Sequence, residues 1–114
     1  MRLINKTRRS SLGLLRLADH LATRLLGLLI TDPAKDNRPL WLRPCSAVHT
    51  FGMRYALDLV FLDRGLKVVK IALNVRPFRI CTSLRHGTYS VIEFFSGTWD
   101  PNQIAVGDEL EILP

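Results

Sequence analysis

The sequence has few cysteines and no long apolar run. Its 114 residues include two cysteines without a CxxC or zinc-type spacing, which excludes a disulfide framework and a zinc-ligand module. The most apolar window, Leu21 to Ile30, is too short to span a bilayer and contains Arg24. Charged residues after the basic start also break any apolar stretch of the kind that a signal peptide needs. We therefore expect a cytoplasmic protein with reduced cysteines.

Phosphate-binding loops and base-stacking platforms are lacking as well. The seven glycines are scattered as turn glycines are, so no glycine-rich loop is available to cradle a phosphate. Aromatic residues make up only 8% of the chain and do not alternate with basic ones, as a single-strand binding surface requires. Nucleic-acid binding is therefore disfavoured, and no cofactor is expected.

What the chain does have is a positive charge of +6, from 16 basic and 10 acidic residues. Basic residues are concentrated at the start: Arg2, Lys6, Arg8, Arg9 and Arg16 all precede the first acid. We interpret residues 1–10 as a flexible basic start and residues 11–114 as a single globular domain. Such a start is usually a solvated arm, but it could also bind a partner or an anionic membrane surface.

The apolar pattern predicts one helix and several strands. Leucines with helical spacing predict a short helix over 21–29, and clustered leucines at 12–17 favour a strand before it. Further on, apolar runs bounded by turn residues predict strands at 57–62, 66–73, 89–95 and 109–113. The first two of these form a hairpin. We therefore predict an α+β fold, with a mainly antiparallel sheet that could curl toward a barrel and one short N-terminal helix.

The densest reactive chemistry lies between Cys45 and Asp63. A Cys45–His49 nucleophile and base would need to approach to about 3 Å, whereas residues four apart on a strand are separated by roughly 13 Å. That pair is therefore disfavoured within the segment. Metal ligands would have to come from distant histidines and cysteines with no recognisable spacing, and no metal site is predicted.

Asp58 is the stronger candidate for a functional group. In an extended strand it shares a face with Val60 and Leu62, so its carboxylate should be partly buried and in need of a partner. Candidate partners are His49, Arg54 and the backbone amides of 50–53. Two interpretations remain open: Asp58 pins this turn, or it forms a His49–Asp58 pair for proton transfer or ligand binding.

With these residues in hand, the chain resembles the family called domain of unknown function 192. The matching elements, in chain order, are Arg24 with Gly27-Leu28-Leu29, Cys45, Val48-His49-Thr50-Phe51-Gly52-Met53-Arg54, 57–63, Asn74, Pro77, Glu93, Gly97 and Val106-Gly107-Asp108. The resemblance implies a compact, mainly antiparallel β fold with a small helical element, and no established activity. The chain departs from the usual pattern at 30–31 and at 94–96.

Three functions remain open. The first is a small binding or accessory domain for an unknown ligand or protein partner, and its candidate site residues are Arg24, His49, Thr50, Arg54 and Asp58. The second is a small hydrolase or transferase that uses His49 as a base oriented by Asp58. The third is a protein that docks on a partner or a membrane surface through its basic start.

Overall fold

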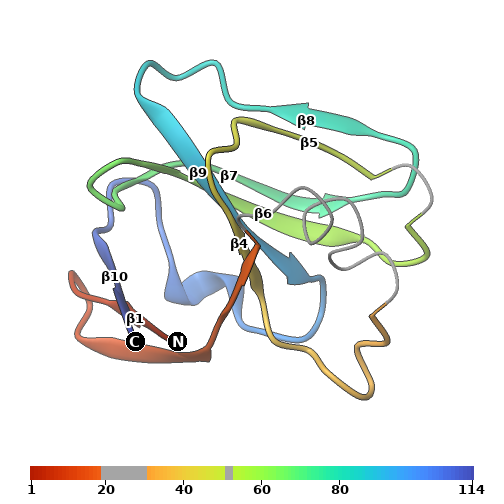
Figure 1. The fold of residues 1–114 in the computed structure, drawn as a ribbon, viewed down its shortest axis with the longest axis horizontal. Coiled ribbons are helices and arrows are strands. Elements are labelled where there is room, and N and C mark those ends of the chain that lie inside the picture. The colour runs from red at the N-terminus through yellow and green to blue at the C-terminus, as the bar shows by residue number, and fades with distance from the viewer. Residues whose placement is uncertain (19–30, 51–52) are drawn as a thin grey trace.

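The computed structural model describes residues 1–18, 31–50 and 53–114, and it describes His49 through its backbone. Its strands are β1 (Arg2–Asn5), β2 (Ser10–Leu14), β3 (Arg16–Ala18), β4 (Leu40–Leu42), β5 (Ala47–His49), β6 (Leu57–Asp63), β7 (Val68–Val75), β8 (Ile80–Thr82), β9 (Thr88–Phe95) and β10 (Leu110–Leu113). A 3₁₀ turn, η1, spans Pro101–Gln103. The strands form three sheets of order β10-β1-β2, β3-β4-β9-β6-β7 and β5-β8 (Figure 1).

The five-stranded sheet is the centre of the molecule. Its inner strands β6 and β9 pair antiparallel along their whole length, and β7 pairs with β6 as the predicted hairpin. Only the β3–β4 pair, among the strands described, is parallel. Nearly all residues of β6 and β9 are buried, because both faces of the sheet are covered, and this explains their almost uninterrupted apolar sequences.

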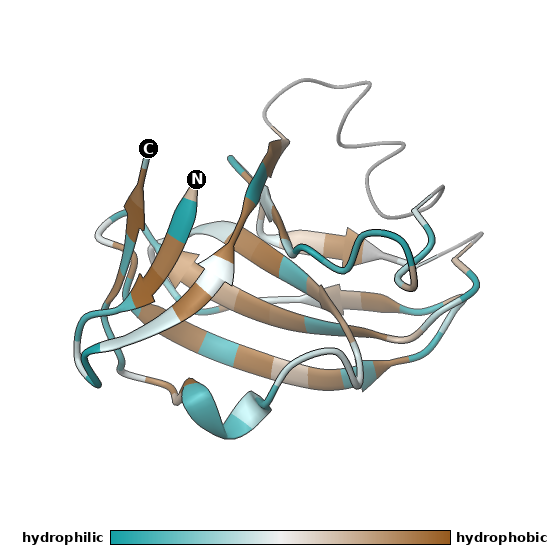
Figure 2. Cartoon of the chain, turned by 90° about the horizontal axis from the view of Figure 1, so that it is seen from below, coloured by the Kyte–Doolittle hydropathy of each residue, from teal (hydrophilic) through white to brown (hydrophobic). Residues whose placement is uncertain are grey.

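Side chains of the central strands alternate between two apolar clusters. One cluster contains Leu57, Leu59 and Phe61 from β6 and defines what we call the first face of the sheet. The other contains Val60 and Leu62 and defines the second face. Figure 2 shows apolar residues concentrated along these strands, with polar residues mainly in the connections.

Each face is covered by one of the smaller sheets. The β5–β8 pair covers the first face, since Val48 belongs to its cluster and Cys81 packs against it. The β10-β1-β2 sheet covers the second face through Leu3 and Leu110. Figure 1 shows the three layers, with β8 at the upper edge and β1 and β10 at the lower one.

The predicted α+β class is wrong. Apart from one 3₁₀ turn, every regular element in the described part of the chain is a strand, so the fold is nearly all β. The helix predicted over 21–29 lies outside the described residues. The outer strands β3 and β7 do not pair with each other in the ranges that the structure covers, and these ranges therefore contain no closed barrel.

The basic start contributes directly to the fold. Residues 2–5 form β1, and the side chains of Leu3 and Asn5 are fully buried. The boundary expected between residues 10 and 11 falls inside β2. Apolar residues that alternate with the charged ones, such as Leu3, pack this segment against the second face.

Candidate functional site

Asp58 is buried on the second face and accepts three hydrogen bonds. Its Oδ1 accepts from the backbone N–H of Asn74 at 2.9 Å and from the hydroxyl of Ser96 at 2.6 Å. Its Oδ2 accepts from the indole N–H of Trp99 at 2.7 Å, and that indole stacks on Phe94 with ring centroids 3.9 Å apart. The carboxylate therefore joins β6 to β7 and to the turn that follows β9.

These partners differ from the expected ones. The sequence favoured His49, Arg54 and the amides of 50–53, all close in sequence, whereas the observed donors lie 16 to 41 residues away. Asp58 pairs in register with Phe94, which belongs to the second-face cluster, and β5 lies over the first face. The structure thus places the Asp58 carboxyl on the side of the sheet opposite to β5.

Thr50 has a structural role at the end of β5. Its hydroxyl donates to the backbone oxygen of Arg76 at 2.6 Å and accepts from the backbone N–H of Arg79 at 2.9 Å. It is fully buried, and these bonds hold the connection between β7 and β8. Arg54 is exposed. The backbone of His49 pairs with Ile80, while the side chain of His49 and all of Arg24 lie outside the described residues.

Cys45 lies beside an open surface pocket of about 400 Å³, lined also by Ala47 and Tyr89. Its thiol donates to the backbone oxygen of Ala47 at 3.1 Å, and both Cys45 and Cys81 are free thiols. Cys45 precedes β5 and the side chain of His49 lies outside the described residues, so the disfavoured Cys45–His49 dyad stays a prediction.

Glu93 is the buried acid of the first face. It lies in the middle of β9, opposite Leu40 of β4 on one side and Leu59 of β6 on the other. Only 7% of the residue is exposed, and burial raises the pKa of its carboxyl to about 7. No side chain among the described residues donates a hydrogen bond to this carboxyl or forms an ion pair with it.

Arg16 lies in the same cross-strand row as Glu93. It pairs with Leu40, which in turn pairs with Glu93, so the three side chains point to the same face of the sheet. Strand spacing puts the backbones of Arg16 and Glu93 roughly 10 Å apart. We call Arg16, Leu40, Glu93 and Leu59 the Arg16–Glu93 row.

The guanidinium of Arg16 is only partly neutralised. Its Nη1 lies 3.9 Å from Oδ2 of Asp36, which is beyond hydrogen-bond distance. The hydrogen bond from Arg38 is the main reason why the pKa of Asp36 falls to about 2. Nε and Nη2 of Arg16 are buried and have no partner in the described part of the chain. These two atoms form the edge that binds a carboxylate or phosphate in a bidentate manner.

Two neutral groups are also buried without a described partner: Nε1 of Trp41 and Oγ of Ser90. Both residues lie on the second face by their pairing with Ile92 and Leu62. A neutral group of this kind costs less to bury than a charged one. The Arg16–Glu93 row is therefore the more unusual feature of the central sheet.

No group of three or more His, Cys, Asp or Glu residues is arranged to hold a metal ion in the ranges 1–18, 31–50 and 53–114. Within the same ranges, no helix has the length and apolar character needed to cross a membrane.

Comparison with known proteins identifies the family. The family model for DUF192, described as Uncharacterized ACR, matches residues 4–112. The chain belongs to this family. Two curated relatives named UPF0127 proteins support the assignment. The protein of Pyrococcus furiosus is 32% identical over 84% of each chain, and that of Pyrococcus horikoshii is 29% identical over 87% of each.

Solved structures share the fold of this DUF192 domain. A protein of unknown function from Novosphingobium aromaticivorans superposes with a TM-score of 0.76 at 20% identity, covering 97% of this chain and 82% of its own. A protein from Sinorhizobium meliloti, named as a candidate transcription regulator, gives a TM-score of 0.76 at 21% identity, covering 96% and 89%. At these identities the likeness shows the fold alone.

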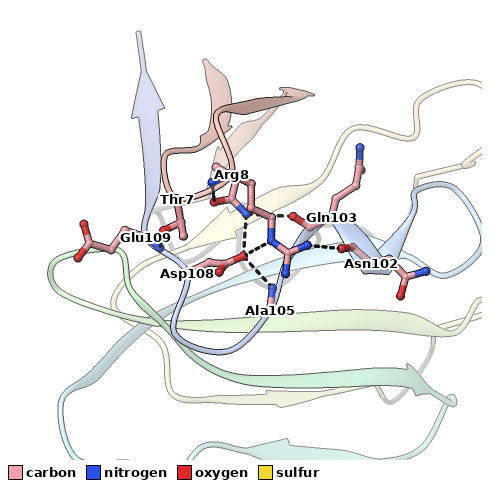
Figure 3. Close-up of polar contacts among 8 residues, drawn as sticks. Thr7, Arg8, Asn102, Gln103, Ala105, Asp108 and Glu109 are labelled. Carbon is pink, nitrogen blue, oxygen red and sulfur yellow. Dashed lines mark hydrogen bonds and ion pairs between the residues drawn. The ribbon is translucent and has the colours of Figure 1, made fainter.

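A further family element, Val106-Gly107-Asp108, has a structural role. Gly107 has a φ of 96°, which favours glycine, and its N–H donates to the backbone oxygen of Val68 at 2.8 Å. Oδ2 of Asp108 accepts from Asn5 and Arg8, both at 2.9 Å, and from the N–H of Ala105 at 3.0 Å (Figure 3). The cluster thus ties the N-terminal hairpin to the segment before β10.

The pKa of Asp108 reflects this cluster. Burial by itself would raise the pKa, but the hydrogen bonds from Asn5 and Ala105 and the charge of Arg8 hold it below its ordinary value. The three donors to Oδ2 of Asp108 all come from the protein itself. We therefore assign Asp108 a role in the fold and not in a ligand site.

Proposed function

We propose that this DUF192 domain is a small binding protein whose ligand site lies on the first face of the central sheet, at the Arg16–Glu93 row. The observation that carries the proposal is the presence of two groups of opposite charge on one face. The carboxyl of Glu93 is buried without a described partner, and the half-buried Arg16 faces Asp36 through Nη1 but has no described partner for its buried Nε and Nη2. Leaving such groups without partners is costly, and a ligand that satisfies both would recover that cost.

The chemistry of the two groups indicates the kind of ligand. The free Nε–Nη2 edge of Arg16 matches a carboxylate or a phosphate. Glu93 offers an acceptor when it is ionised and a donor when it is protonated, and with a pKa of about 7 it can be either near neutral pH. A small molecule that carries an acid group and an amine or hydroxyl fits both positions.

The other two functions have less support. A His49–Asp58 pair would need the Asp58 carboxyl on the face that β5 covers, whereas that carboxyl lies on the opposite face with three donors. Docking through the basic start would need a free arm, whereas Leu3 and Asn5 are buried and Arg8 is paired with Asp108.

Thermal unfolding with small-molecule probes tests the proposal. The panel contains inorganic phosphate, succinate, β-alanine and glutamate, and we expect at least one of these to raise Tm, because a ligand that binds only the folded state stabilises it. Titration calorimetry should then show that Arg16→Lys, which keeps the charge but loses the bidentate edge, weakens binding about tenfold or more. Glu93→Gln should weaken amine-bearing probes more than succinate.

Arg38→Lys is the matched control, since Arg38 also contacts Asp36 but is exposed. It should bind the probes as the unaltered protein does. Failure of every probe, or equal binding by the Arg16→Lys and Glu93→Gln variants and the unaltered protein, would contradict the proposal.

A further inference from the structure

One long continuous stretch of the chain contains no acidic residue. Residues 64–92 contain six Lys or Arg residues and neither Asp nor Glu, while the rest of the chain carries ten of each sign and so no net charge. This stretch covers β7, β8 and most of β9. Residues 1–18 are a second basic segment, with five Lys or Arg residues and no acid.

Three large apolar side chains in the same stretch are exposed to solvent. Phe78 is 66% exposed, Ile80 67% and Leu84 94%. They lie on β8 and in the turns on either side of it, and no other large apolar side chain among the described residues is as exposed as Leu84. Single exposed apolar residues are ordinary, but three within seven positions of one edge strand are not.

The position of β8 brings these residues to the outside of the molecule. Among the described strands β8 pairs with β5 alone, and it forms the upper edge in Figure 1. Cys81 packs against the first-face cluster, so its neighbour Ile80 points away from the core. We define the β8 surface as Arg76, Phe78, Arg79, Ile80, Leu84 and Arg85, of which all six are exposed.

We propose that the β8 surface binds the interface of an anionic lipid bilayer. Ile80, Leu84 and Phe78 would enter the boundary between headgroups and acyl chains, while the three arginines contact lipid phosphates. Exposed apolar side chains with exposed cations next to them in sequence, in a stretch without acids, are the pattern of peripheral membrane attachment. It is a separate feature from the Arg16–Glu93 row and does not depend on the proposed ligand.

Other anionic partners fit the surface less well. A nucleic acid would be bound by aromatic stacking together with cations, and Phe78 is the one aromatic residue of the β8 surface. An acidic protein would satisfy the arginines, but the aliphatic tips Ile80 and Leu84 gain most from an apolar phase. These partners are therefore outcomes of the test and not part of the proposal.

Vesicle co-sedimentation of the full chain provides the test. Vesicles of pure phosphatidylcholine are compared with vesicles of phosphatidylcholine and an equal amount of phosphatidylglycerol. We expect binding to the mixed vesicles that falls with added salt, because the headgroup attraction is screened. The variant with Arg76, Arg79 and Arg85 all changed to Gln should bind roughly a hundredfold more weakly, at about a fivefold loss for each cation.

The apolar contribution is tested with Ile80→Thr and Leu84→Ser, each of which should weaken binding by tenfold or more at constant charge. Leu73→Ser is the matched control, since Leu73 is 49% exposed but lies on β7 outside the β8 surface. The charge control changes the exposed Arg2, Arg9 and Arg38 to Gln. Both controls should bind as the unaltered protein does, and circular dichroism and Tm confirm that each variant is folded.

Three results would overturn the proposal. One is absence of binding to the mixed vesicles at low salt. Another is an equal loss of binding in the Arg2, Arg9 and Arg38 control. The third is binding to poly-uridine or poly-glutamate that exceeds vesicle binding and is unchanged by Leu84→Ser, which would assign the surface to a nucleic acid or an acidic protein.

Discussion

Two buried carboxyl groups on neighbouring strands of the central sheet have opposite surroundings. Asp58 on β6 pairs with Phe94, the residue next to Glu93 on β9, so the two acids point to opposite faces of the same part of the sheet. Asp58 is 2% exposed and accepts three hydrogen bonds, whereas Glu93 is 7% exposed and receives none from the described residues. Two acids that are both buried thus differ in role. Asp58 stabilises the fold through its hydrogen bonds, whereas the carboxyl of Glu93 is free to bind a ligand.

The largest expected effect is on the Asp58 side of this comparison. Asp58→Ala leaves three donors unpaired, among them the half-buried indole of Trp99, and we expect the free energy of unfolding to fall by about 3–4 kcal/mol. Urea denaturation at neutral pH measures it. Glu109→Gln, at an exposed acid, is the control and should change stability little. A loss below about 1 kcal/mol for Asp58→Ala would show that these hydrogen bonds do not hold the turn.

The next effect belongs to Glu93 and appears as a pH dependence. A carboxyl whose pKa is raised from 4.5 to about 7 binds more protons in the folded than in the unfolded state between these values. The free energy of unfolding therefore holds its full contribution from protonated Glu93 below pH 4.5. It falls by about 3 kcal/mol as the pH rises from 4.5 to 7. Glu93→Gln should remove this fall.

Urea denaturation of both proteins across that pH range checks the prediction, and the difference between the two curves isolates Glu93 from Asp36 and Asp108. Those two acids have lowered pKa values, so their contributions are lost at lower pH, as the pH falls through the folded-state values. Parallel curves for the two proteins would mean that Glu93 is not an isolated buried acid.

The smallest effect comes from removing one of the donors to Asp58. Ser96→Ala deletes the 2.6 Å hydrogen bond but leaves those from Asn74 and Trp99, so we expect a loss of about 1.5 kcal/mol. A double-mutant cycle with Asp58→Ala should show strong coupling, since the serine hydroxyl has little to gain once the carboxylate is gone. Additive losses would instead mean that Ser96 stabilises the turn by another route.

The long strands were predictable from the sequence, and most short ones were not. Strands β6, β7 and β9 match the predicted ranges closely, because each is a long, mainly apolar run with turn residues at its ends. The four-residue β10 was predicted from the turn at 106–108 before it. By contrast, β4, β5 and β8 have three residues each, too few for a period of two to be recognised. The α+β class rested on leucine spacing at 21–29, which lies outside the described residues, whereas the described elements are nearly all strands.

The candidate site was only partly predictable for a related reason. Asp58 was correctly placed on one face with Val60 and Leu62, since alternation along a strand is local information, but it was expected to be only partly buried. Its donors are far away in the chain, and local reasoning could not find them. Glu93 was named as a family element but was not predicted as a site residue. An acid in the middle of an apolar strand does, however, indicate a buried carboxyl. Arg16 was counted among the basic residues of the start, because its pairing with β4 depends on the tertiary fold.

The most direct test of the account is the pKa of Glu93 itself, measured by following its side-chain carboxyl carbon by NMR during a pH titration. The account predicts a value near 7 for the ligand-free protein, and a shift of that value when a probe binds at the Arg16–Glu93 row. A pKa at or below 4.5 would mean that the carboxylate already has a cationic or hydrogen-bonding partner within the protein. That result would contradict the proposed site.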